Sequence, residues 1–253
     1  MSVKKFYDTT GWKKQSKNFI DAEIFEDLRN CAKDYVKNCR LRILRHIPKK
    51  GENILDFASG PIQYEEYLRY SENFKYRYCI DFSSDAIEQA KEKLKNHGKY
   101  LCDDFMNIDF DKNFFDCSLC IHTLYHIEKN IQKNTVEKLI NITKSKKPVI
   151  ILYSNSDNLI SKFKRKLRLN SPNYKNPNIY FYCHELNWWN QFKKFGDVKI
   201  YPWRSFASQH QKILFPNNLI GKILFKLLFF LEDYFPNFFV KNFQYYFVVI
   251  NKN

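Results

Sequence analysis

The chain has 253 residues, of which 44% are hydrophobic and 18% aromatic; this composition supports a full hydrophobic core and excludes an intrinsically disordered chain. The formal net charge of +15 raises the hypothesis of a nucleic acid or another anionic partner, but lysines scattered along the whole chain indicate compositional bias more simply. Seven cysteines and a charged N-terminus without an apolar signal core argue against a secreted disulfide framework, so we expect a cytoplasmic protein.

The first 50 residues predict a helical cap. Residues 1–20 are polar and carry two aromatic side chains, Tyr7 and Trp12. On the sequence alone, the simplest interpretation is that these side chains pack on the following helix. From residue 21 to 47 the apolar positions recur at helical spacing, which predicts one or two amphipathic helices.

The stretch Asn53–Tyr67 organises the rest of the chain. A short apolar run ends at Asp56, and the small-residue turn Ala58–Pro61 follows before helix-compatible residues resume. This order predicts a strand, a tight turn and a helix. Such a turn lies at the carboxyl end of a strand, where backbone N–H groups face a ligand-binding crevice. Gly60 allows close approach of the backbone, and Pro61 is suited to a first helical turn.

Two further strands end in carboxylates. The run 76–80 ends at Asp81, roughly 20 residues beyond Gly60, where an acid that binds ribose hydroxyls is expected. Ser83 or Ser84 is then expected to cap the next helix. The run 100–102 ends at Asp103 and Asp104. Because adjacent parallel strands end at one edge of a sheet, these acids point to one ligand site, although each could instead serve only as a helix cap.

Four motifs together resemble the class I S-adenosylmethionine-dependent methyltransferases, with a type 11-like domain. They are Ile54–Pro61, Cys79–Lys91, Asp103–Phe110 and Phe115–His126, and the resemblance covers roughly residues 50 to 155. One departure is clear. The family's turn carries three glycines, whereas this chain keeps only Gly60 and has Ala58 and Ile62 at the other two places.

The resemblance implies S-adenosylmethionine as cofactor and a set of binding residues. Asp81 would bind the ribose, Phe82 would pack near the adenine, and Asp104 matches the adenine-side acid better than Asp103. Asp56 would order the turn through backbone N–H groups, and Tyr7 and Trp12 would close over the cofactor. The full expected set is Tyr7, Trp12, Asp56, Ala58, Ser59, Gly60, Pro61, Asp81, Phe82, Asp103, Asp104, Phe105 and Ile121.

The middle of the chain alternates strands and helices. Residues 114–121 predict a buried parallel strand, 129–146 a helix and 148–153 a fifth strand. Cys117 and Cys120 lie on the first of these strands, and their separation points them to opposite faces, so no metal site is expected. The alternation predicts an α/β fold with a doubly wound, Rossmann-like sheet of seven strands, mostly parallel with an antiparallel last strand.

The last hundred residues add helices and closing strands. We expect helices at 157–169 and 186–195, a strand at 198–203 and an antiparallel edge strand at 245–250. The segment 219–231 places Ile220, Ile223, Leu224, Leu227, Leu228 and Leu231 on one face. It is too short to span a bilayer and either covers the domain, forms a dimer interface or touches a membrane. The segments are therefore 1–50 (cap or lid), 51–155 (cofactor core) and 156–253 (substrate-side helices and closing strands of the same domain).

The loop after the fourth strand is the candidate catalytic element. In the resembling family it lies where the transferable methyl points, and it contains His122 and His126. Either imidazole can act as a general base near neutral pH or can simply shape the pocket. Weaker pocket candidates are Tyr153, Trp203, Arg204 and His210. The histidines straddle a strand end and no Glu follows the first, so zinc is not expected.

The function these features predict is methyl transfer to a small molecule. The signatures Asn-Pro-Pro-Tyr, Asp-Pro-Pro-Tyr and Pro-Cys of DNA methyltransferases are absent from the sequence. The aromatic C-terminal part suits a sugar, a glycan precursor or another secondary metabolite, with O-methylation as the expected reaction. The alternatives are a basic RNA-binding protein or an RNA methyltransferase with the same fold. A dehydrogenase is disfavoured because the three-glycine pyrophosphate fingerprint is missing.

Overall fold

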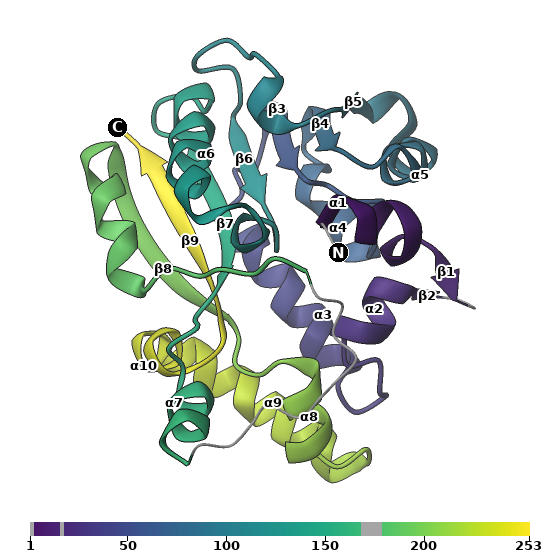
Figure 1. Cartoon of the computed structure of the whole chain (residues 1–253), viewed down its shortest axis with the longest axis vertical. Helices are drawn as coiled ribbons and strands as arrows, with labels where there is room; N and C mark the ends of the chain where they lie inside the picture. The colour runs from purple at the N-terminus through teal and green to yellow at the C-terminus, as the bar shows by residue number, and fades with distance from the viewer. Residues whose placement is uncertain (1–2, 16–17, 168–178) are drawn as a thin grey trace.

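The computed structural model describes residues 3–15, 18–167 and 179–253. Its centre is a seven-stranded sheet in the order β5-β4-β3-β6-β7-β9-β8 (Figure 1). The strands of this sheet are β3 (Gly51–Phe57), β4 (Phe74–Asp81), β5 (Gly98–Cys102), β6 (Cys117–Cys120), β7 (Pro148–Ser154), β8 (Gly196–Arg204) and β9 (Tyr245–Lys252). The strands β3 to β7 pair in parallel, and β9 pairs antiparallel with both β7 and β8. The predicted fold class is confirmed.

The place of the last strand differs from the prediction. β9 was expected at the edge of the sheet, but it lies between β7 and β8, and β8 is the edge strand. β9 reads Tyr-Tyr-Phe-Val-Val-Ile and is buried from Tyr246 to Ile250. A strand of this composition is covered on both faces, and its inner position lets both of its edges form hydrogen bonds, with β7 and with β8.

Helices flank the sheet on both faces. They are α1 (Val3–Phe6), α2 (Ile20–Phe25), α3 (Lys33–Leu41), α4 (Glu65–Leu68), α5 (Ser84–Leu94), α6 (Lys129–Ile142), α7 (Leu159–Lys166), α8 (Ser208–Leu214), α9 (Leu219–Tyr234) and α10 (Pro236–Asn242). The segment 21–47 thus forms two α-helices, α2 and α3, followed by a 3-10 turn, Arg42–Arg45. The segment expected as a helix at 186–195 is a 3-10 helix, Leu186–Lys194. A short hairpin, β1 (Lys14–Gln15) and β2 (Asn18–Phe19), lies between α1 and α2.

Side chains of β7 alternate between two hydrophobic cores. Ile151 packs with Val136 of α6 on one face of the sheet, whereas Ile150 packs with Val36 of α3 on the other. This alternation is the period-2 pattern of a strand covered on both sides. Cys120 lies in the first core and Cys117 in the second, which confirms that these two thiols point to opposite faces.

Candidate functional site

The turn after β3 keeps a left-handed backbone at three places. Ala58, Gly60 and Ile62 have φ angles of 55°, 55° and 50°. These are the three positions at which the resembling family carries glycine, so this chain keeps the backbone path with two side-chain-bearing residues. Left-handed geometry costs an L-residue roughly 1–2 kcal/mol. Pro61 does not start a helix, because α4 begins only at Glu65, and that part of the prediction was wrong.

Asp81 fixes this turn from the end of the neighbouring strand. Its Oδ2 accepts the backbone N–H of Gly60 at 2.9 Å, and its Oδ1 accepts the N–H of Ser83 at 2.9 Å. Ser83 in turn caps α5, as predicted, with its Oγ accepting the Ala86 N–H at 3.5 Å. The carboxyl group is buried, and burial raises the pKa of Asp81 to about 6 against the lowering effect of its two backbone donors.

Asp56 has a different partner from the one expected. Its carboxylate accepts hydrogen bonds from Arg77 of β4, from Nε at 3.1 Å and from the second guanidinium nitrogen as well. Both side chains are buried, so this ion pair lies in the sheet rather than at the turn. The turn receives its carboxylate from Asp81 instead, and the prediction that Asp56 orders the turn amides was wrong.

The N-terminal segment lies against the same turn. A Cβ added at Gly60 would lie 3.0 Å from Cζ2 of Trp12, so glycine is required here for contact as well as for φ. Trp12 stacks on Tyr7, whose hydroxyl donates to Asp21 of α2 at 3.3 Å. Among the described residues, the buried Nε1 of Trp12 has no hydrogen-bond partner. Trp12 thus lies against the turn and Tyr7 packs on α2, while closure of the pair over a cofactor stays a prediction.

The residues expected on the adenine side lie at the end of β5. Asp103 and Asp104 are exposed. Asp104 caps a short 3-10 turn, with Oδ1 accepting the N–H of Met106 at 2.9 Å. Phe105 is buried and stacks on Phe57 with ring centroids 4.4 Å apart, so its side chain belongs to the core. Phe82 is half-buried next to Asp81.

His122 follows β6 in a cluster of aromatic side chains. Its own backbone is left-handed, with φ 59°. Nδ1 lies 2.8 Å from the hydroxyl oxygen of Tyr125, and the imidazole contacts the ring of Trp203 edge-on at 4.5 Å and that of Tyr245 at 5.9 Å. Burial, with the Arg204 cation as the next cause, lowers the pKa of His122 well below its ordinary value, so this imidazole is neutral at pH 7.

The second histidine has a structural partner. Nδ1 of His126 donates to the backbone carbonyl of Tyr180 at 2.8 Å, and the phenol of Tyr180 accepts the N–H of Lys129 at 3.0 Å. Burial lowers the pKa of His126 as well. His126 therefore ties the loop after β6 to the segment around Tyr180, while half-buried Ile121 precedes His122 at the end of the strand.

A buried ionic cluster near His122 includes residues that the sequence did not indicate. Glu26 accepts from Arg204 and from Arg40, the latter at 2.6 Å, and Arg40 also lies 3.2 Å from Glu66. Arg204 lies over the rings of Trp203 and Tyr245. Of this cluster only Trp203 and Arg204 were predicted as pocket candidates. In the sequence, Glu26 and Arg40 stand in an amphipathic segment in the way that solvent-exposed charges do. No local pattern therefore distinguished these buried charges from exposed ones.

The chain is similar to known proteins in sequence and in fold. A family model described as a methyltransferase domain matches residues 55–148. An uncharacterized protein of Methanocaldococcus jannaschii is 26% identical over 164 residues, which are 62% of this chain and 63% of that protein. The chain thus spans less than two thirds of this relative's length.

Two solved structures are similar in fold. The first is the N-methyltransferase NodS from Bradyrhizobium japonicum in complex with S-adenosylhomocysteine, with a TM-score of 0.56, 10% identity and coverage of 94% of this chain and 93% of that one. The second is phosphoethanolamine N-methyltransferase 2 of Haemonchus contortus in complex with S-adenosylmethionine, with a TM-score of 0.53 and 16% identity. The superposition covers 85% of the chain described here but only 52% of the Haemonchus contortus chain.

Proposed function

The chain carries a class I S-adenosylmethionine-dependent methyltransferase domain, and on this premise we propose that it methylates a small molecule, with S-adenosylmethionine as methyl donor. The observation that carries the proposal is the contact between Asp81 and the left-handed turn at Gly60. The cofactor supplies an electrophilic methyl group on a sulfonium. The protein has to bind both reactants in register and, for a hydroxyl acceptor, to remove one proton.

The turn and the strand ends fit this cofactor. Each oxygen of Asp81 accepts one backbone N–H, and a carboxylate oxygen can accept a second donor. A ribose diol would supply two such donors to a desolvated carboxylate. Burial raises the pKa of Asp81 to about 6, and hydrogen bonds from such donors would favour its ionised form. The orphaned Nε1 of Trp12 beside Gly60 is a further donor available to a ligand.

The other cofactor contacts are assigned by the same layout. Backbone groups of Ala58, Ser59, Gly60 and Pro61 would face the methionine part, and Phe82 and Asp104 the adenine, with Asp103, Phe105 and Ile121 shaping the walls by their backbone positions. Asp56 would act only through its pairing with Arg77. Residues 1–50 would form the cap, 51–155 the cofactor core and 156–253 the acceptor side.

His122 is the candidate general base. Its imidazole is neutral, because burial and Arg204 disfavour the cation, so it can take a proton from an acceptor hydroxyl. His126 is assigned a positioning role, because its Nδ1 holds the backbone of Tyr180. The rings of Tyr125, Trp203 and Tyr245 around His122 suit a ring-bearing acceptor such as a sugar, which supports O-methylation of a metabolite or glycan precursor.

Calorimetric titration with S-adenosylmethionine and S-adenosylhomocysteine tests the cofactor assignment. We expect saturable one-site binding by the wild type, its loss in Asp81→Ala, and no change in Asp111→Ala, which alters an exposed carboxylate. Circular dichroism tests whether Asp81→Ala is folded. If Asp81→Ala is unfolded, Asp81→Asn is used in its place. A wild type that binds neither compound contradicts the proposal.

Transfer of a labelled methyl group separates the acceptor classes. Incubation with sugar and metabolite pools is expected to give a labelled small molecule, and His122→Ala is expected to lower turnover without changing cofactor affinity. Label that appears only in RNA, with an affinity that falls steeply with salt, would replace the small-molecule proposal by the RNA methyltransferase.

A further inference from the structure

Helix α9 turns an apolar face to solvent. The segment was expected to cover the domain, to form a dimer interface or to touch a membrane with this face. Ile220 is 60% and Ile223 is 56% exposed, whereas Leu228 and Leu231 of the expected face are half-buried and Leu228 packs against the core. The exposed apolar side chains recur every three or four residues along one side of the helix. They are Leu219, Ile220, Ile223, Leu227, Phe230 and Tyr234. One helical side is therefore apolar and faces water over the whole length of α9.

The opposite side of α9 is fixed to the domain by polar contacts. Glu232 is fully buried and accepts from Arg42 at 2.7 Å, from Tyr35 Oη at 2.6 Å and from the N–H of Ser205 at 2.9 Å. Phe225, two helical turns before Glu232, is buried in the core with Tyr35. Rotation of the helix to bury the exposed apolar side chains would carry the Glu232 carboxylate out of this network and leave the buried Arg42 guanidinium without this anionic partner, which is costly.

The neighbouring helices also carry exposed apolar side chains. Ile213 and Leu214 at the end of α8 are 69% and 52% exposed, and Phe238 of α10 is 54% exposed. Figure 1 shows α7, α8, α9 and α10 in the lower part of the view and β3, β4 and β5 in its upper part. We call the exposed side of α8, α9 and α10 the terminal face. Exposed apolar side chains on three helices of one end of the molecule mark a candidate interaction surface.

Exposed basic side chains lie on the same three helices. Lys212 of α8 and Lys226 of α9 are exposed, as is Lys241 of α10. Of the acidic residues of α9, Glu232 is buried against Arg42 and Asp233 pairs with Arg42 and Arg45. Cations among leucine, isoleucine and phenylalanine are the composition of a helix that lies in the interface of an anionic bilayer.

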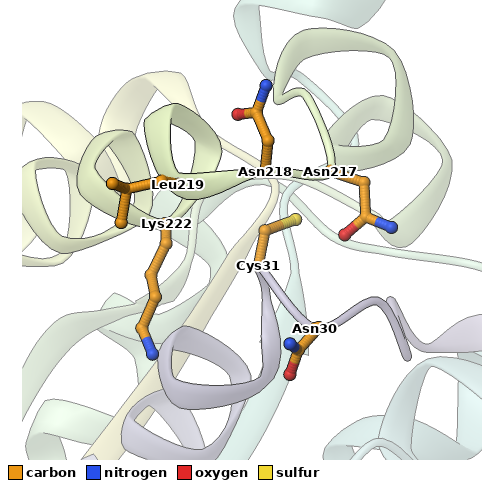
Figure 2. Close-up of a pocket in the computed structure, with 6 residues that line it drawn as sticks. All are labelled: Asn30, Cys31, Asn217, Asn218, Leu219 and Lys222. Atoms are coloured by element: carbon orange, nitrogen blue, oxygen red, sulfur yellow. The ribbon is translucent and has the colours of Figure 1, made fainter.

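A polar pocket opens at the start of α9. It has a volume of about 270 Å³ and is lined by Asn30, Cys31, Asn217, Asn218, Leu219 and Lys222 (Figure 2). Leu219 belongs to both the pocket and the terminal face. The Lys222 ammonium lies 3.0 Å from the carboxylate of Asp34. The pocket therefore places amide groups and an ion-paired ammonium beside an exposed leucine.

We propose that the terminal face binds the surface of an anionic lipid bilayer, with the leucine and isoleucine side chains of α9 inserted and Lys212 and Lys226 at the phosphates. None of the helices in the described part of the chain is long and apolar enough to cross a membrane, so the contact is peripheral. A second copy of the chain is the less suitable occupant. The net charge of +15 on each copy would oppose that association and favours an anionic surface.

Vesicle flotation with the full chain tests the proposal. We expect the protein to float with vesicles of phosphatidylcholine mixed with phosphatidylglycerol and much less with phosphatidylcholine alone. The triple variant Ile220→Ser/Ile223→Ser/Leu227→Ser should lose at least about tenfold in partitioning, because each side chain contributes apolar area. Its matched control is Leu28→Ser, an exposed apolar residue outside α8 to α10. Circular dichroism and thermal unfolding verify that the variants are folded.

Charge-reversal variants measure the electrostatic contribution to vesicle binding. Lys212→Glu/Lys226→Glu should abolish the preference for anionic vesicles, whereas Lys91→Glu/Lys99→Glu changes the net charge equally on α5 and β5 and should leave it intact. Failure of the wild type to bind anionic vesicles overturns the proposal. So does a stable dimer in light scattering that the serine variant dissociates, because the terminal face would then bind a second copy.

Discussion

The pKa of Asp81 gives the sharpest prediction about the candidate site. Burial raises it from 3.8 to about 6 in the folded protein, so the folded state binds this proton more tightly than the unfolded state does. Between these two values, stability must therefore fall as the pH rises. Each pH unit corresponds to 1.36 kcal/mol, so about two units amount to about 3 kcal/mol. The whole penalty is present above pH 6 and absent below about pH 4.

The substitution Asp81→Asn removes this titration and keeps the shape of the side chain. The difference in unfolding free energy between Asp81→Asn and wild type should shift in favour of the variant by about 3 kcal/mol from pH 4 to pH 7.5. Urea unfolding followed by circular dichroism measures it at each pH. Burial also raises the pKa of Asp21 to about 6, but Asp21 is present in both proteins and its contribution cancels. Asp111→Asn, at an exposed position, is the control.

Cofactor binding should depend on pH in the opposite direction from stability, because it should become stronger as the pH rises. If the ribose hydroxyls donate to the Asp81 carboxylate, protonation competes with binding, and the dissociation constant should rise about tenfold from pH 7 to pH 5. A variant whose stability curve runs parallel to that of wild type would refute the assignment of the raised pKa to burial of Asp81. An affinity independent of pH in the wild type would refute the ribose contact.

The remaining predictions concern the turn, the cap and the C-terminal helix. Ala58→Gly should stabilise the protein by up to about 1 kcal/mol, because it relieves a left-handed alanine. Ile62→Gly should destabilise it by about 2–4 kcal/mol, because the isoleucine is buried. Thermal unfolding measures both changes. Trp12→Ala should weaken S-adenosylmethionine binding by about tenfold in calorimetry while the fold is kept. Arg42→Met leaves Glu232 buried without its cation and should cost about 3–5 kcal/mol in urea unfolding, against little change for the exposed Arg45→Met.

The sequence predicted the order of strands and helices because local patterns determine it. Apolar runs that end in Asp56, Asp81 and Asp103 mark the carboxyl ends of β3, β4 and β5, and their bounds agree within two or three residues. The contacts among those acids were less predictable. Asp56 pairs with Arg77, and an arginine inside the strand Phe74–Asp81 was the one available signal of a buried ion pair. Position in a motif indicates where a carboxylate lies and leaves open which donor it binds.

Helix α9 shows why amphipathic pattern alone does not decide which face is buried. Its sequence offers a leucine-rich face and a mixed face, and the usual expectation buries the leucines. The mixed face contains Glu232, and a helix orientation is decided by all contacts together. Arg42, Tyr35 and Ser205 lie up to 197 residues away in the chain and satisfy that carboxylate completely. Because no local pattern shows these partners, the outward direction of Ile220, Ile223 and Leu227 follows only from the folded structure, and the apolar surface they form is best explained by a partner outside the chain.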